Sequence, residues 1–343
     1  MPAMMTAGFW KSRKAVGLWL LAVTAIILFM VIVGGLTRLT GSGLSITEWQ
    51  PIMGAIPPLS ETAWAEAFEK YRQIPQYAQE NAGMTLEGFK NIFWWEWGHR
   101  FLGRFLGLFF AVPFLWFAFT GAIARREWSR FVILFALGGL QGAIGWWMVM
   151  SGLETRISVA PFRLAIHLGA AVILLGWIFW TALDYLRPAK SGWAPRLVIG
   201  FIGLIYLQIL LGAVVAGLDA GLIYNTWPDM NGRFTPPDAF FYSPWWHNFF
   251  ENPGLAQFNH RMVAYIIAGV TILVYIDAIR QPHKSAAKNT GKGATILVAL
   301  QIFLGIVTLL FQAPLGLSAL HQTVAALLFC TAVWHAHEMR KAA

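Results

Sequence analysis

Residues 17–36 read GLWLLAVTAIILFMVIVGGL, an apolar run of the length that crosses a bilayer as a helix. The run is too long for the core of a secretory signal peptide and no clear cleavage site follows it, so we interpret it as a retained first span. Seven further apolar runs follow, roughly at 94–123, 129–151, 163–186, 195–218, 258–280, 293–313 and 318–338. The sequence therefore predicts an all-α integral membrane protein with eight transmembrane helices.

Composition agrees with a lipid environment. Of the 343 residues, 57% are hydrophobic and 12% are charged, whereas soluble domains carry about 25% charged residues. The net charge is +9, and the Lys and Arg residues gather near both termini and in the short loops after the second, fourth and sixth spans. Because positive charge marks the cytoplasmic side, we expect cytoplasmic termini in a bacterial inner membrane. The positive charge therefore indicates which side of the membrane each loop faces. We do not expect a nucleic-acid partner.

The two long outer loops, about 39–93 and 219–257, hold most of the acidic residues. In the first of them, Trp64, Phe68 and Tyr71 recur at helical spacing with glutamates on the other faces. This pattern predicts an amphipathic helix that lies along the membrane surface.

The chain contains an internal repeat. Four segments of the first half match four segments of the second half in the same order: GGLTRLTGSGLSITEWQPIMG (34–54) with VAGLDAGLIYNTWPDMNG (215–232), EWGHRFLGR (96–104) with QFNHRMVAY (257–265), LQGAIGWWMVM (140–150) with LQIFLGIVTLL (300–310), and HLGAA (167–171) with HQTVA (321–325). An even number of spans separates the matches, so both halves have the same orientation. We therefore predict a parallel repeat of two pseudo-symmetric four-helix bundles, about residues 1–190 and 191–343.

The repeat brings four histidines, His99, His167, His260 and His321, into equivalent places near the outer end of their helices. We expect each to lie within about two turns of that end. Ionisable residues inside a membrane are costly and usually functional, and two facing imidazoles in a four-helix core can hold a haem iron. One turn below each histidine stands a small residue that leaves room for a porphyrin: Gly103, Ala171, Ala264 and Ala325.

Other interpretations of these histidines stay open. A single histidine in a membrane helix often forms a hydrogen bond across the bundle, and small residues also allow close helix packing. A zinc site usually needs three or four ligands in one place, whereas these histidines come as two pairs.

Charged residues beside the pairs break the symmetry of the repeat. Glu96 precedes His99 by three residues and is predicted to face the same pocket, whereas Gln257 stands at the matching place in the second half. A carboxylate beside a haem can transfer protons or stabilise a developing cation, which suggests that chemistry occurs in the first half. Alternatively, Glu96 is an exposed acid at the start of the helix, where its negative charge interacts favourably with the helix dipole. Arg100 and Arg261 are candidates for binding the haem propionates.

Several of these strings together resemble the haem A synthase family over nearly the whole chain. The resemblance rests on residues 34–59, GGLTRLTGSGLSITEWQPIMGAIPPL, and on EWGHR (96–100), HLGAA (167–171), NHR (259–261) and LHQTVA (320–325). It implies two four-helix bundles and a reaction that oxidises a methyl group of haem O to a formyl group, through hydroxylated intermediates, to give haem A.

The resemblance also implies roles for individual residues. His260 and His321 would bind the iron of a haem b, and His99 and His167 would bind the iron of the substrate, haem O, with Glu96 as a catalytic residue. Some relatives carry a cysteine pair in the first outer loop. The single cysteine of this chain, Cys330, lies in an apolar run instead, so no such pair operates here.

The family implies haem O synthase and cytochrome oxidase assembly factors as partners, and it leaves homo-oligomer formation open. A different class of function is a bis-histidine b-type membrane cytochrome, or a haem-handling protein that performs no chemistry.

Overall fold

The computed structural model of the protein describes residues 12–187, 192–282 and 285–340. Its long helices are α2 (Arg13–Leu39), α5 (Leu86–Phe119), α6 (Trp128–Met150), α7 (Pro161–Leu186), α8 (Arg196–Gly217), α10 (Pro253–Arg280), α11 (Ala286–Leu310) and α12 (Leu315–Glu338). All eight are long and apolar enough to cross a membrane, and these described ranges contain no strand. The predicted class and the eight predicted spans are confirmed, whereas the predicted boundary at residues 190 and 191 lies outside the described residues.

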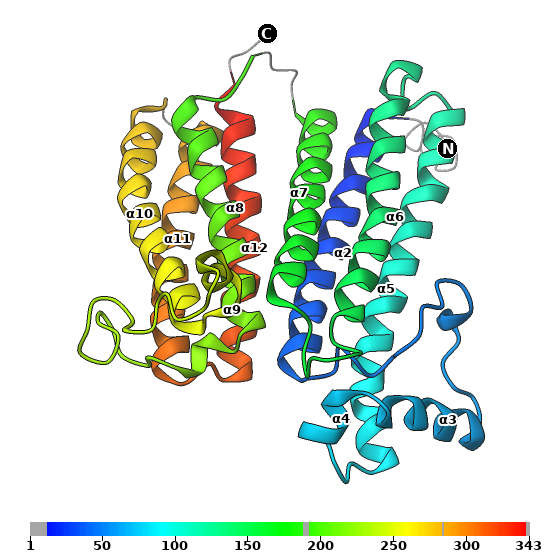
Figure 1. Ribbon diagram of the computed structural model, residues 1–343. Coiled ribbons are helices and arrows are strands. Elements are labelled where there is room, and N and C mark those ends of the chain that lie inside the picture. The colour runs from blue at the N-terminus through cyan, green and yellow to red at the C-terminus, as the bar shows by residue number, and fades with distance from the viewer. Residues whose placement is uncertain (1–11, 188–191, 283–284, 341–343) are drawn as a thin grey trace.

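The eight helices form two groups that stand side by side, and the start of α2 and the end of α12 lie at the same end of the molecule (Figure 1). In the first group α2 and α6 each contact both α5 and α7. In the second group α8 and α11 each contact both α10 and α12. Since α2, α5, α6 and α7 precede α8, α10, α11 and α12 in the same order, each group has the same neighbours, which supports the predicted repeat.

The largest difference from the predicted spans is at the start of α5. This helix begins at Leu86, where the Thr85 hydroxyl accepts a hydrogen bond from the N–H of Gly88 at 3.2 Å. Its first turns lie below the other spanning helices, beside α3 (Glu61–Arg72) and α4 (Pro75–Glu80) (Figure 1).

The predicted helix at residues 64–71 is confirmed as α3, but protein rather than lipid covers much of its apolar face. Tyr71 and Phe89 are fully buried, and the ring centroids of Trp64 and Phe93 lie 4.9 Å apart. Aromatic packing of this kind fixes the outer loop onto the start of α5. The first half thus carries an ordered cap over its outer end.

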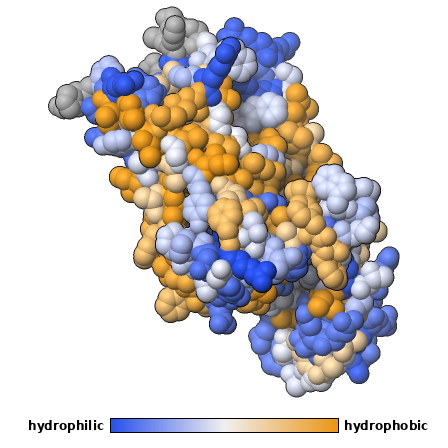
Figure 2. All heavy atoms as spheres, turned by 60° about the vertical axis from the view of Figure 1, so that its left-hand side comes forward, coloured by the Kyte–Doolittle hydropathy of each residue, from blue (hydrophilic) through white to orange (hydrophobic). Residues whose placement is uncertain are grey.

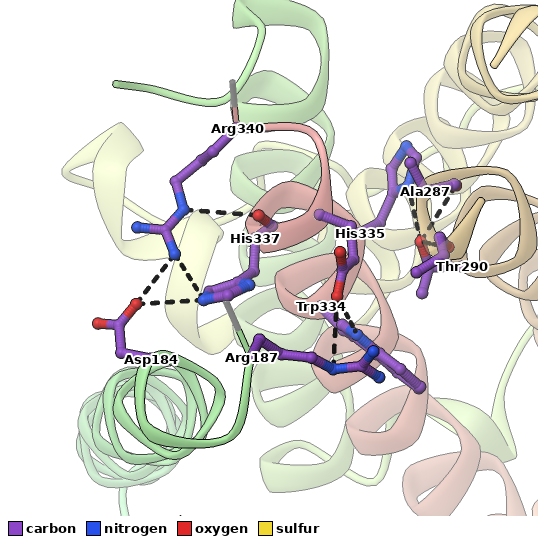
Figure 3. A network of polar contacts seen from close by, with 10 residues as sticks. Asp184, Arg187, Ala287, Thr290, Trp334, His335, His337 and Arg340 are labelled. Carbon is purple, nitrogen blue, oxygen red and sulfur yellow. Dashed lines mark hydrogen bonds and ion pairs between the residues drawn. The ribbon is translucent and has the colours of Figure 1, made fainter. Parts of the chain in front are cut away.

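Polar contacts join the two halves at both ends. At the end with the long loops, which the sequence predicts to be the outer end, Arg38 of α2 donates to the carbonyl of Ala216 at 2.9 Å and pairs with Asp219, also at 2.9 Å. At the opposite end, predicted to be the inner one, Asp184 of α7 lies 3.1 Å from the ring of His337 and 2.9 Å from Arg340 (Figure 3). Between these ends α12 contacts both α2 and α7, so the halves form one packed body.

Hydrophobic residues cover the outside of the helices between two hydrophilic ends (Figure 2). Along α5, for example, Phe105, Leu108, Val112 and Trp116 are exposed. In water an apolar surface of this extent would drive aggregation, whereas in a bilayer it faces lipid tails. The protein is therefore a multi-pass membrane protein.

The contact between α2 and α12 gives a test of this packing. The Gln322 amide donates to the Val31 carbonyl at 2.5 Å and crosses directly over Gly35. A methyl group at Gly35 would displace this amide, so we expect Gly35→Ala to lower the unfolding free energy by about 1–3 kcal/mol, measured by thermal unfolding in detergent. Gly203→Ala is the control because nothing lies within 4 Å of the added carbon. Equal stability of the two variants would contradict the packing.

Candidate functional site: two histidine pairs

The second half contains a close pair of histidines. The rings of His260 on α10 and His321 on α12 face each other, with centroids 6.5 Å apart and planes at 72°. Each ring is only partly buried. A separation of this size accommodates one iron bonded at about 2 Å to a nitrogen of each ring. The Nδ1 atoms of both rings are buried without a partner. The structure therefore brings the two predicted histidines of the second half together.

The first half holds its histidines on the corresponding helices. His99 lies on α5 and His167 on α7, and both are partly buried. Among the described residues no ring contact like that of the second pair joins them. Because α5 begins at Leu86, His99 is not within two turns of its helix start, and this part of the prediction was wrong for His99. The two pairs are therefore unequal in spacing.

All four histidine rings pack against a glycine of a neighbouring helix. A Cβ atom added to the glycine would lie 2.9 Å from His99 at Gly34, 3.0 Å from His167 at Gly145, 3.2 Å from His260 at Gly212, and 3.1 Å from His321 at Gly305. Cβ atoms rarely approach a neighbour this closely, so a larger residue at any of these positions would crowd the ring.

These glycines were missed at the level of sequence, although the repeat contains them. Gly145 and Gly305 occupy the same place in the matched segments 140–150 and 300–310. At Gly103, the small residue predicted below His99, an added Cβ atom would lie 3.6 Å from the Met30 methyl group, an ordinary contact distance. The glycines beside the rings are therefore the closer constraint on the position of each histidine.

Glu96 lies beneath the first outer loop. The side chain is 3% exposed, and its Oε2 accepts from the Ser45 hydroxyl and from the N–H of Ile46, both at 2.8 Å. Its Oε1 accepts from Arg100 at 2.6 Å. The expectation that the carboxylate points into an open pocket with His99 is corrected: both oxygens are directed at the loop and at Arg100.

Gln257 binds the corresponding loop in the second half, but it donates hydrogen bonds to this loop whereas Glu96 accepts them. Its amide nitrogen donates to the carbonyls of Ala220 and Ile223 at 2.8 and 2.6 Å, and its oxygen accepts from Arg261 at 2.9 Å. The loop after α2 therefore offers donors to a glutamate, and the loop after α8 offers acceptors to a glutamine. In Glu96→Gln the amide NH₂ would face one of the donors that now bind the carboxylate, and that donor would lose its hydrogen bond.

The two arginines bind the same loops. Arg100 donates to the carbonyls of Ile46 and Glu48 at 2.8 and 3.1 Å, and Arg261 donates to those of Tyr224 and Asp229 at 2.8 and 2.7 Å. The Nε of Arg261 is buried without a partner. Each arginine thus holds an outer loop over its histidine pair, and Arg261 retains one free donor.

The turn that receives Arg261 is itself ordered. The Thr226 hydroxyl donates to the Asp229 carboxylate at 2.6 Å and the Gly232 N–H donates to it at 3.1 Å. These two donors stabilise the charged form and hold the pKa of Asp229, which lies outside the spans, below its usual value. The backbone carbonyl of Asp229 is therefore presented to Arg261 by a closed turn.

Two histidines at the inner end take no part in the pairs. His335 and His337 are fully buried, and His335 places its Nδ1 3.1 Å from the Thr290 hydroxyl (Figure 3). His337 belongs to the Asp184 and Arg340 network. Within the part of the chain that the structure describes, no three His, Cys, Asp or Glu side chains gather as a metal site.

Eight helices long and apolar enough to cross a membrane form two four-helix groups, and each group carries two histidines on opposite helices, which defines an integral membrane protein of two bundles. Residues 17–333 match the family described as cytochrome oxidase assembly protein, and the chain belongs to this family.

Similar proteins include the heme A synthase of Parvibaculum lavamentivorans, 48% identical over 96% of this chain and 96% of that protein. The heme A synthase of Nitrosospira multiformis is 45% identical over 96% of this chain and 94% of its own length. That of Rhodopseudomonas palustris strain TIE-1 is 49% identical over 91% of this chain and 85% of its own.

The glycine contacts lead to a prediction about haem binding. Gly305→Ala places a methyl group against the His321 ring, so we expect the affinity of the second pair for haem to fall by about tenfold. The haem-to-protein ratio and the low-spin absorption spectrum of the purified protein measure this. Gly316→Ala on α12, the helix that carries His321, is the control, because nothing lies within 4 Å of its added carbon. Haem content that falls equally in both variants, or in neither, would contradict the prediction.

Proposed function

We propose that this chain is a haem A synthase, an oxidoreductase that converts a methyl group of haem O to a formyl group, through hydroxylated intermediates, and supplies haem A to cytochrome oxidase. The observation that carries the proposal is a pair of unequal bis-histidine sites in a chain that matches heme A synthases at 45–49% identity over most of its length. Two equal sites would suit a cytochrome that only carries electrons.

The proposal assigns a haem b to the second half, with its iron held by His260 and His321. The donor set fits, because the two imidazoles lie on opposite helices of the bundle with ring centroids 6.5 Å apart, and imidazole nitrogen is a common ligand of haem iron. A bound haem b would supply one-electron redox chemistry next to the reaction. The free Nε of Arg261 supports a contact with a propionate at this site.

The substrate haem O is assigned to the first half, at His99 and His167. There Arg100 already binds Glu96 and two loop carbonyls, so a propionate contact would add to this network. The ordered cap of α3, α4 and the start of α5 lies over this half and can limit the access of water.

Glu96 is proposed as the catalytic carboxylate. Three donors hold it in place, which makes it a fixed acceptor of the kind that stabilises positive charge as it develops on a reacting methyl carbon. Two donors occupy Oε2 and one occupies Oε1, so a single lone pair of Oε1 remains for a proton. Because the three donors fix the carboxylate in position, we propose the electrostatic role of the two that the sequence suggests.

The cellular setting follows from the charge distribution and the fold. We place the protein in the bacterial inner membrane with its termini in the cytoplasm and its histidine pairs near the periplasmic side, because the Lys- and Arg-rich connections lie at the end opposite the long loops. Haem O is poorly soluble in water, so a haem O synthase is the expected donor and cytochrome oxidase assembly factors are the expected acceptors of the product. A homo-oligomer is compatible with this arrangement.

The experiment compares haem pigments in cells that make haem O. We expect wild-type protein to contain haem A or its hydroxylated precursor, and Glu96→Gln to accumulate haem O, with activity lower by about 100-fold. Extracted haems are separated by chromatography. Haem b alone in the wild type would leave a b-type cytochrome or a haem-handling protein.

The matched control for Glu96→Gln is Ser45→Ala. Ser45→Ala removes one of the hydrogen bonds to the carboxylate but keeps its charge, so we expect most of the activity to remain. If both variants lose activity to the same extent, Glu96 anchors the loop and has no catalytic role.

A further inference from the structure

The loop after α2 contains a segment that is apolar and has little support from the rest of the protein. Residues 49–60 read WQPIMGAIPPLS and contain no charged residue; we call them the apolar segment. The side chains of Ile52, Met53, Ile56 and Leu59 are between 59% and 82% exposed, and no residue of the short helix η1 (Met53–Ala55) is buried. An exposed apolar cluster of this kind marks an interaction surface.

Arg104 of α5 binds this segment at the level of the spanning helices. Its Nε donates to the carbonyl of Pro51 at 2.7 Å, and its Nη2 donates to the carbonyl of Gln50 at 2.8 Å. About 20 helical residues cross the hydrocarbon core of a bilayer, so a span that ends where α5 ends, at Phe119, reaches the outer boundary near residue 100. At a rise of about 1.5 Å per residue, Arg104 lies about 6 Å inside this boundary. The blue loop that precedes α3 accordingly lies level with the lower part of the spanning helices (Figure 1).

The backbone of the apolar segment is suited to lipid. Inside a bilayer each backbone polar group must find its partner within the protein. A short turn pairs the N–H groups of residues 54–56 with carbonyls earlier in the segment, at 3.1 Å each. Positions 51, 57 and 58 are prolines, which have no N–H to pair. Most positions from 50 to 58 therefore leave no backbone N–H that needs water.

The matching loop of the second half has a different character. When the repeated segments are aligned at their tryptophan, the place of Ile52 is taken by Met230, which is 1% exposed and lies between two polar residues. On α10 the counterpart of Arg104 is Tyr265, which has no guanidinium to bind two carbonyls. The apolar segment and its arginine are therefore features of the first half alone.

The apolar segment begins beside the first histidine pair. The carbonyl of the residue before Trp49 accepts from Arg100, which follows His99, at 3.1 Å. The Trp49 ring reaches α6, where its centroid lies 5.4 Å from that of Trp146. Trp146 in turn follows the glycine against which the His167 ring packs. The start of the segment thus extends from the helix that carries His99 to the helix that packs on His167.

We propose that the apolar segment lies in the outer leaflet of the bilayer, held by Arg104, and that a haem with a long apolar tail passes beneath it between the bilayer and the first histidine pair. Its partner is the acyl-chain region of the lipid, because the segment continues the apolar surface that Phe101 and Leu108 expose on α5. A segment with few buried contacts opens easily. The passage of haem rests on the proposed function, whereas the insertion in lipid does not.

Fluorescence quenching in phosphatidylcholine vesicles tests the insertion. Cys330→Ser gives a chain without cysteine, and Ile56→Cys then supplies one site for a bimane label. Glu66→Cys, at an exposed position of α3, is the matched control. We expect a lipid with a nitroxide on its acyl chain to quench the label at position 56 strongly and iodide in the water to quench it little, with the reverse at position 66. Equal quenching of both labels by iodide would overturn the insertion.

The role of Arg104 is tested by Arg104→Met, which removes both hydrogen bonds to the segment. We expect the label at position 56 to show lower anisotropy, and a tailed haem bound at the first pair to move to acceptor vesicles about tenfold faster, the effect of one or two net hydrogen bonds. Arg72→Met, on the exposed face of α3, is the control.

Haem at the second pair is an internal control, because a general loss of stability would accelerate its release as well. Faster transfer from the first pair alone supports the passage beneath the segment. An unchanged rate in Arg104→Met, or an equal acceleration at both pairs, would overturn it.

The two proposals can fail separately. A label at position 56 that is quenched from the lipid, in a protein that forms no haem A, would support the insertion and contradict the synthase function. Haem A formation by a protein whose label is quenched by iodide would do the reverse.

Discussion

A polar or ionisable side chain inside a bilayer needs a hydrogen-bond partner, a counter-charge or a ligand, and this requirement organises both halves of the protein. Glu96 and Gln257 meet it with loop groups and an arginine one turn further along the helix. The histidine pairs meet it only in part, because His260 and His321 each keep a buried ring nitrogen without a partner. Under the proposed function a haem iron is the ligand of the second pair, and the packing of the four-helix core holds the two rings where they lie.

Under the proposed function the same framework serves two different tasks, and a difference at one position breaks its symmetry. The glycine beside each ring is common to all four histidines, so it sets the position of the ligands without distinguishing the sites. Glutamate at position 96 gives the first half a carboxylate where the second half has the amide of Gln257. This difference is consistent with duplication of one four-helix bundle, of which the first copy is proposed as the substrate site.

Much of the architecture was predictable from sequence because lipid imposes a strong and periodic signal. The eight apolar runs, the repeat and the four histidines all lie in spans of this kind. The start of α5 was placed too late because Glu87 and Lys90 interrupt its apolar pattern, and packing under α3 rather than lipid stabilises those turns. The surroundings of Glu96 were mispredicted for a related reason, since Ile46 and Ser45 reach it from a loop about fifty residues earlier, and helical periodicity carries no information about such contacts.

The central claim is that the two histidine pairs hold chemically different haems. An electron cryomicroscopy structure of the protein, purified from cells that make haem O, tests it most directly by showing the ring substituents of the porphyrin at each pair. The account predicts haem b between His260 and His321, and a porphyrin with the long hydroxyethylfarnesyl tail of haem O or haem A at His99 and His167. The same haem at both pairs, or the tailed porphyrin in the second half, would contradict it.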